Sequence, residues 1–288
     1  MANVTTTTAA NFIPEMWRDA ILDYAERRFQ IRNQVLDFSS MLSGGGDILN
    51  IPKVAEETAA AKSADTAVTY SANTDGVIQL SVDQHHYEAK RIEDIVRVQE
   101  SADLFNAYAR SMGYALSKKV ENYIALLIQT GSGNDVDLTA DNTFTTAKVR
   151  EGLQKLLDAN YDYTDGETFF YCSPAAYMSL LSLGDFTEAQ KRGDSENPLA
   201  TGQIINAYGM PVYVSTDWDD DGGTGDETAS IFNRNSVYFA QQLAPRVQSE
   251  YQVDYLATAV VADVLFGAAL SHAANSTSLP IVNFNNIA

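Results

Sequence analysis

The sequence predicts an α+β fold, because strand-like and helical patterns occupy separate parts of the chain. Within residues 44–99, the segments 47–54 and 77–82 alternate between apolar and polar side chains, as half-buried strands do. Residues 101–129 carry apolar side chains at helical spacing instead. From about residue 140, short helical and strand-like segments alternate. This order predicts an arm, a long helix, and then a compact α/β unit with strands that return to the helix.

The N-terminal region reads as a polar tail of residues 1–11 followed by a helix. Phe12-Ile13-Pro14-Glu15 opens that helix, and its apolar positions continue weakly to Val35 or Leu36. Arg27, Arg28 and Arg32 make its end basic. They either complement the helix dipole or contact an acidic partner, such as another subunit or a scaffold.

A projecting hairpin is predicted next. Residues 47–54 and 77–82 alternate like strands, whereas the tip over 55–76 has only Val68 and Tyr70 as large apolar residues. A two-stranded hairpin is marginally stable alone in water, so its apolar edge must rest on something else. In a chain without a catalytic cluster, the simplest support is a neighbouring copy. Gly44, Gly45 and Gly46 read as a hinge at its foot.

One long amphipathic helix is predicted over 101–129. Leu104, Tyr108, Met112, Leu116, Val120, Ile124 and Ile128 recur at intervals of four. Ser101 is a plausible N-cap and Gly131 a natural stop. The helix should serve as the spine of the molecule.

Shorter elements are expected beyond residue 140. Helices are predicted over 147–157 and from Pro174 to about Leu183, with a strand over 168–171 before the second helix. Further strands are predicted over 230–232, 237–240, 248–254 and 258–270.

Composition narrows the functional classes. The net charge is -19 over 288 residues. From Gly193 to the end there are eleven acidic residues, and the basic residues are Arg234 and Arg246, which gives a local net charge of -9. Such a surface repels phosphate backbones, which argues against a dedicated nucleic-acid binder. The sequence has no run of 18 apolar residues and no pattern of a secretory signal, so we expect an intracellular product without a membrane span. Cys172 is the only cysteine, which excludes an intrachain disulfide.

The catalytic patterns that we tested are incomplete. Cys172-Ser173 lies at a strand-to-helix turn but lacks the Gly-x-Ser-x-Gly frame, so a packed thiol and a helix cap are expected. His85 and His86 should point to opposite faces of a strand and cannot easily share a metal. No phosphate-binding glycine loop is present. We therefore expect no enzyme and no cofactor.

An acidic loop over 217–227 offers a calcium alternative. Asp217, Asp219, Asp221 and Gly222 match the first half of a calcium loop. The bidentate Glu expected at position 12 is replaced by Thr228, although Asp226 and Glu227 lie nearby. A solvated acidic loop is the competing interpretation.

Several short sequence segments, taken in chain order, resemble those of the major capsid proteins of tailed bacteriophages. The resemblance is carried by Phe12-Ile13-Pro14-Glu15-Met16-Trp17, by 46–52, by Tyr171-Cys172-Ser173-Pro174, by Tyr208-Gly209-Met210-Pro211 and by the stretches 235–241 and 258–268. It implies the Hong Kong phage-type major capsid fold, with an N-arm, an extended β-hairpin loop, a peripheral domain with a spine helix, and an axial α/β domain. On this mapping the N-arm covers 1–43, the extended loop 44–90, the axial domain 140–232, and the peripheral domain 91–139 and 233–288.

The resemblance also implies partners. Copies of the chain would form pentamers and hexamers of an icosahedral shell around double-stranded DNA, assembled in the host cytoplasm, with a portal. Because few residues precede Phe12, a separate scaffold protein is implied. Lys53 and Lys62 lie in the extended loop, but no local motif selects them, so no covalent crosslink is expected. The candidate intersubunit residues are Ile48, Ile51, Val54, Val68, Tyr70, Val77, Ile78, Leu80, Phe12, Trp17, Arg27 and Arg28.

Two alternatives stay open at this point. An encapsulin-like compartment would have the same fold but hold a protein cargo. A calcium-dependent binding module would use the loop 217–227.

Overall fold

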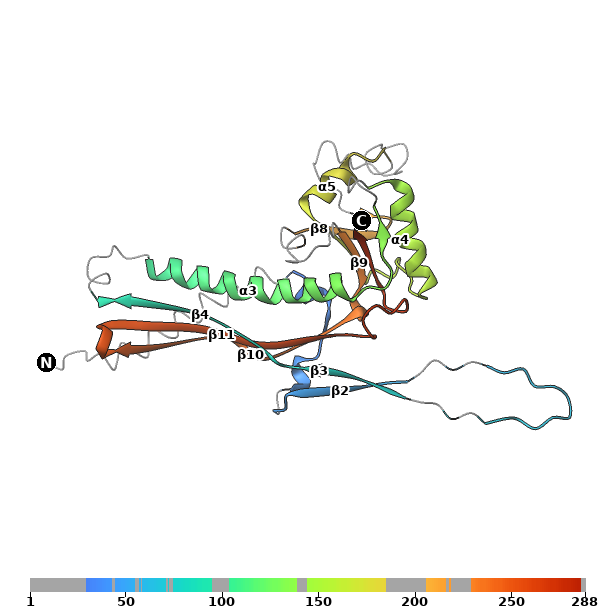
Figure 1. Cartoon of the computed structure of the whole chain (residues 1–288), viewed down its shortest axis with the longest axis horizontal. Helices are drawn as coiled ribbons and strands as arrows, with labels where there is room; N and C mark the ends of the chain where they lie inside the picture. The colour runs from blue at the N-terminus through green and yellow to red at the C-terminus, as the bar shows by residue number, and fades with distance from the viewer. Residues whose placement is uncertain are drawn as a thin grey trace.

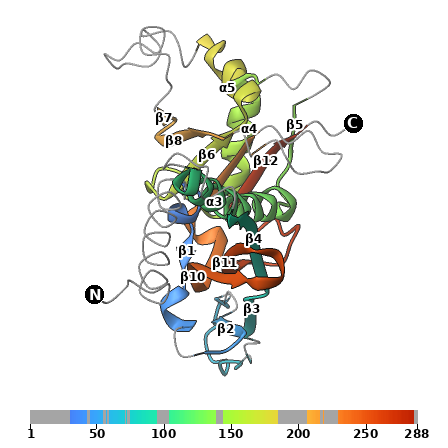
Figure 2. The ribbon, with the colours of Figure 1, turned by 90° about the vertical axis from the view of Figure 1, so that its left-hand side faces the viewer.

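The computed structural model describes residues 30–42, 45–54, 57, 59–70, 72, 75–94, 104–138, 144–184, 206–215, 218 and 229–285. In this part of the chain a long helix lies along a four-stranded sheet, and a second sheet with two shorter helices lies at one end (Figure 1). A two-stranded hairpin projects away from the body. Figure 2 shows these parts as successive layers, with the second sheet and its helices at the top and the hairpin at the bottom.

The spine helix is α3 (Leu104–Gly131), which confirms the long helix predicted from the sequence. Its 28 residues span roughly 42 Å at 1.5 Å per residue. The side chains spaced by four, from Met112 to Ile128, are buried. The spacing therefore identified the face of the helix that packs on the sheet. The predicted N-cap, Ser101, lies outside the described residues.

The four-stranded sheet has the order β1-β10-β11-β4. Its strands are β1 (Leu36–Asp37), β10 (Val237–Gln252), β11 (Ala257–Leu270) and β4 (Gln84–Glu93). β11 is antiparallel to both β10 and β4, and β1 is parallel to β10. The returning strands predicted after residue 230 do pack on the spine helix, as expected.

Two sequence predictions in this region need correction. The strands predicted over 237–240 and 248–254 are one strand, β10, whose pairing with β11 shifts register between Gln241 and Arg246. The helix expected to continue to Leu36 gives way to a 3-10 turn, η1 (Arg32–Gln34), and then to β1. Residues 84–90, which the mapping assigns to the extended loop, pair with β11 as part of β4, and the boundary of that loop stays a prediction.

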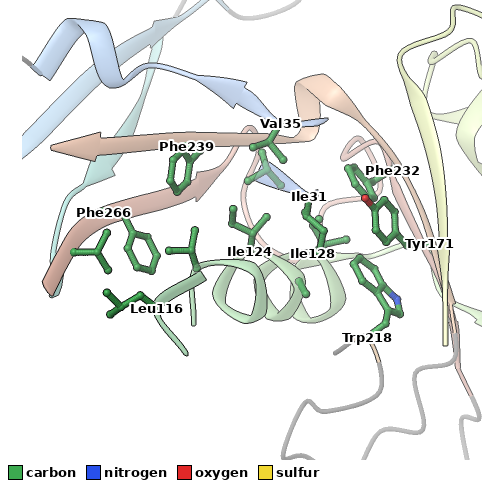
Figure 3. Close-up of a cluster of buried hydrophobic side chains, with 14 of the residues drawn as sticks. Ile31, Val35, Leu116, Ile124, Ile128, Tyr171, Trp218, Phe232, Phe239 and Phe266 are labelled. Atoms are coloured by element: carbon green, nitrogen blue, oxygen red, sulfur yellow. The ribbon is translucent and has the colours of Figure 1, made fainter. Parts of the chain in front are cut away.

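The main hydrophobic core lies between α3 and the four-stranded sheet (Figure 3). Leu116, Ile124 and Ile128 of α3 share this core with Phe239 of β10 and Phe266 of β11. The core continues to Tyr171, Trp218 and Phe232, whose rings lie close together at the junction with the second sheet. This shared core fixes α3 to both sheets.

The second sheet has the order β5-β12-β9-β6-β8-β7. The strands are β5 (Val136–Asp137), β12 (Ile281–Asn285), β9 (Ala229–Asn233), β6 (Thr168–Cys172), β8 (Met210–Val214) and β7 (Asn206–Ala207). Its helices, α4 (Thr146–Asp158) and α5 (Pro174–Leu181), confirm the predicted ones. β5 and β12 lie outside the predicted axial range 140–232, yet both belong to this sheet. The division into domains stays a prediction.

Candidate intersubunit surface

The projecting hairpin consists of β2 (Ile48–Lys53) and β3 (Gly76–Ser81). The strands are antiparallel, with Ile48 opposite Ser81 and Lys53 opposite Gly76. The described residues between Val54 and Asp75 form no strand and are exposed. The ladder is therefore six pairs long, and the tip extends beyond it as the two limbs drawn in Figure 1.

The root of the hairpin is held by a small core of its own. Leu80 and Val82 pack with Leu42 and Ala240, and Leu49 lies against this group. Leu42 belongs to η2 (Ser39–Leu42), which precedes the hairpin. The amide of Val82 donates a hydrogen bond to the carbonyl of Asp47 (2.9 Å). The root is thus fastened to the body, although the outer end is not.

The glycine run at the foot of the hairpin adopts a backbone conformation that other residues rarely adopt. Gly45 has a φ of 92° and Gly46 a φ of 120°. The side-chain amide of Gln242 donates to the carbonyl of Gly46 (3.0 Å). The glycine run therefore forms a turn that a hydrogen bond fixes to β10, and its role as a hinge stays a prediction.

Apolar side chains on the outer hairpin are not covered by their own chain. The exposed fractions are 71% for Val54, 59% for Val68, 94% for Tyr70 and 60% for Val77. Ile48 is also exposed, and Ile51 and Ile78 are half-buried. Such residues on a thin projection can be buried only by another molecule. Their role in an intersubunit contact stays a proposal.

One candidate contact residue is wrong. Leu80 is 0% exposed and lies in the core that holds the hairpin root. Strand alternation placed Leu80 on the apolar face of its strand but could not show that its own chain covers it. The N-terminal candidates Phe12, Trp17, Arg27 and Arg28 lie outside the described residues.

The calcium candidates Asp217, Asp219, Asp221, Asp226 and Glu227 also lie outside the described residues. Within the described part of the chain, no group of three or more His, Cys, Asp or Glu side chains is placed to hold a metal ion.

Trp218 is described and is fully buried, stacked on Tyr171 with ring centroids 5.0 Å apart. The side-chain amide of Gln129 donates to its carbonyl. The sequence did not predict that Trp218 is buried. The feature that could have indicated it is a large apolar side chain between two Asp residues in an otherwise polar loop.

A second exposed apolar group lies at the opposite end of the sheet and was also missed. It surrounds η5 (Val253–Tyr255), which joins β10 to β11. Val253, Tyr255 and Leu256 are all exposed there, and the guanidinium of Arg91 lies 4.0 Å from the centre of the Tyr255 ring. The signal was an apolar sequence at a turn between two long strands.

The two adjacent histidines of β4 point to opposite faces, as predicted. His86 stacks on Phe266 on the face toward α3 (centroids 5.6 Å apart). His85 Nε2 lies 3.0 Å from Oδ2 of Asp263, which also forms a bidentate pair with Arg246 (2.8 and 3.0 Å). These hydrogen bonds, above all those from Arg246, lower the pKa of Asp263. The cluster joins β4, β11 and β10 across the sheet surface.

The strand-to-helix turn at Cys172 is structural. The thiol is fully buried, and burial raises its pKa to about 12, which leaves it un-ionised and unsuited to nucleophilic attack. The hydroxyl of Ser173 accepts a hydrogen bond from the amide of Ala176 and caps α5. The expected packed thiol and helix cap are confirmed.

None of the described helices is long and apolar enough to cross a membrane.

Comparison with known proteins decides what kind of molecule presents this hairpin. A family model described as phage capsid protein matches residues 87–275, which is more than half of the chain. The chain belongs to the phage capsid protein family. This capsid protein has no match among curated proteins. As a member of the family it is a coat protein, and its place is the virion.

Solved structures share the fold of this capsid protein. A structure from Mycobacterium phage Che8 has 21% identity and a TM-score of 0.74, over 89% of this chain and 91% of that one. The capsid of cyanophage P-SCSP1u has 14% identity and a TM-score of 0.69, over 89% and 87%. A virus-like particle from Pyrococcus furiosus has 14% identity and a TM-score of 0.61, over 94% and 98%. The capsid protein therefore has the Hong Kong phage-type fold.

Proposed function

We propose that copies of this capsid protein assemble into pentamers and hexamers, which close an icosahedral shell around double-stranded DNA. The observation that supports this most is the hairpin, which is anchored at its root and exposes Val54, Val68, Tyr70 and Val77 beyond it. A head-to-tail contact of this kind generates a closed ring when the rotations between successive copies add up to one full turn. The hairpin would lie over an adjacent copy.

Repetition makes a modest contact sufficient. Burying one Val or Tyr side chain contributes about 1.5–3 kcal/mol before the cost of ordering the tip is subtracted. In a closed ring, the hairpin of each copy lies on one neighbour, and each copy also carries the hairpin of its other neighbour. The stabilisation by one hairpin contact is therefore repeated once for every copy. The exposed backbone of the tip also offers main-chain donors and acceptors to a neighbour.

The other expected parts of the assembly extend this proposal. The N-arm 1–43, with Phe12, Trp17, Arg27 and Arg28, would reach beneath another copy. The net charge of -19 suits a container that is filled by a motor through a portal and does not attract DNA itself. A separate scaffold protein would guide assembly in the host cytoplasm.

The proposal is tested by electron microscopy of purified particles together with analysis of their contents. Closed shells that hold double-stranded DNA are the expected result. Shells that hold a protein cargo would favour the encapsulin-like compartment, and the absence of shells would overturn the assembly proposal. Calorimetry with calcium tests the loop 217–227 separately, because no heat at millimolar calcium would remove that alternative.

A further inference from the structure

A hollow of about 360 Å³ lies between the outer end of the hairpin ladder and the turn that leaves β11. The hairpin and the body therefore do not close on each other at this point, although they are in contact nearer the root. The side chains that matter for its chemistry are Lys53, Val77 and Ile78 from the hairpin, and Leu270, Ser271 and His272 from the body.

Two groups in this hollow can carry a positive charge, the Lys53 ammonium and the His272 imidazole. In the part of the chain that the structure describes, no carboxylate forms an ion pair with Lys53 or His272. Burial lowers the pKa of the Lys53 ammonium. Burial and, secondly, the charge of Lys53 lower the pKa of His272. The hydroxyl of Ser271 lies 3.0 Å from His272 Nδ1, which leaves Nε2 of that ring for another contact. Both cationic groups would be stabilised by an anion between them.

The lining fits one kind of anionic group. The Lys53 ammonium and the imidazole Nε2–H of His272 can donate to the two oxygens of a carboxylate, and hydrogen bonds to an ionised acceptor are the strong ones. Val77, Ile78 and Leu270 supply an apolar rim against which the methylene groups of an acidic side chain can pack. We propose that this hollow binds an Asp or Glu side chain of a second copy of the capsid protein, which fastens the outer end of the hairpin ladder to its neighbour.

A second copy is a better match than a small anion for two reasons. The chain has 38 acidic residues against 19 Lys and Arg, so the surface of another copy presents many carboxylates. The hollow is also continuous with the hairpin surface that is proposed to lie on a neighbour, because Val77 and Ile78 belong to both. The inference rests on the proposed function and adds the chemistry of the contact.

Carbodiimide crosslinking of assembled particles tests the inference directly, because this reagent joins an amine only to a carboxylate that touches it. Particles grown from a mixture of ¹⁵N-labelled and unlabelled chains distinguish links between copies from links within one. The expected product is a mixed-label peptide pair that joins Lys53 to an acidic peptide. The same pair should not form when the particles are dissociated before the reagent is added.

Variants give an independent measurement on the same particles. Lys53→Gln and His272→Gln should each raise the concentration of free subunit in equilibrium with particles by about ten-fold, the size of one charge-assisted hydrogen bond. Lys53→Arg should preserve most of the association. Lys62→Gln is the matched control, because Lys62 is exposed on the same hairpin away from the hollow. Thermal unfolding verifies that each variant is folded.

The outcomes separate this inference from the proposed function. Normal particles in which Lys53 stays unlinked, or links only within its own chain, overturn the inference and leave the proposed function standing. In the dissociated subunit, inorganic phosphate could also protect Lys53 from an acylating reagent. That result would assign the hollow to a small anion and would overturn the inference. If no particles form at all, the proposed function fails and the inference fails with it.

Discussion

Gly267 of β11 lies directly against the backbone of Ser81 at the end of β3. A Cβ atom on Gly267 would be 2.0 Å from the carbonyl oxygen of Ser81 and 2.9 Å from the Cα of Val82. Backbone atoms cannot move aside as the end of a flexible side chain can. The missing side chain of Gly267 therefore sets how closely the hairpin root approaches the sheet, and with it the direction in which the hairpin projects.

Replacing Gly267 by Ala tests this packing. The added methyl group must displace the hairpin root, so we expect the free energy of unfolding to fall by about 1–3 kcal/mol. Denaturant unfolding of the subunit measures it. Gly76→Ala is the matched control, because a Cβ atom there has ordinary contact distance, 3.9 Å from the carbonyl oxygen of Lys53. Equal stability of the two variants would contradict the interpretation.

Trp218 is predicted to anchor the segment after β8 to the main core. Trp218→Ala removes a fully buried ring from its stack with Tyr171 and Phe232, so we expect a loss of about 3–5 kcal/mol in unfolding free energy. Tyr70→Ala, which removes a ring that is 94% exposed, should change it by less than about 0.5 kcal/mol. A small loss for Trp218→Ala, comparable to that control, would show that the ring contributes little to the core.

The Asp263 cluster predicts a pH dependence of stability. Hydrogen bonds from Arg246 lower the pKa of Asp263 in the folded chain below its unfolded value of about 4. The stabilisation is therefore fully present above that unfolded pKa and is lost as the pH falls through the folded pKa. Unfolding at several pH values should show wild type more stable than Asp263→Asn above about pH 5, with the difference shrinking below about pH 4. A difference that does not depend on pH would contradict the assignment.

Much of the fold follows from local periodicity. The intervals of four from Met112 to Ile128 predicted both the helix and its buried face, and Ser173-Pro174 marked the start of α5. These features depend on residues near one another in the sequence. Local patterns are therefore sufficient to identify them.

The parts that sequence did not predict depend on long-range contacts. Residues 241–247 look like a loop because Pro245 and polar side chains interrupt them, yet pairing with β11 extends β10 through them. Leu80 and Trp218 have ordinary local surroundings, and their burial comes from Ala240 and Tyr171, which are distant in sequence. Alternation also could not separate β3 from β4, since only the pairing partner changes after Val82.

The exposed apolar residues of the hairpin tip give a graded prediction. Val68→Ser combined with Tyr70→Ser should leave the subunit stability unchanged, because both side chains are exposed, but reduce the yield of shells. The control exchanges exposed polar residues of the same tip, Ser63→Ala with Thr69→Ala. Sedimentation of each assembly mixture measures the yield. Equal yields would exclude these two side chains from the contact.

Removal of the tip tests most directly whether the hairpin joins neighbouring copies. Lys53 and Gly76 are register partners, so Asn-Gly can replace residues 54–75 as a two-residue turn without disturbing the ladder or the root core. Negative-stain micrographs of this variant, beside wild type, are the measurement. We expect subunits with wild-type thermal stability that form no closed shells. Normal shells from the shortened chain would contradict it.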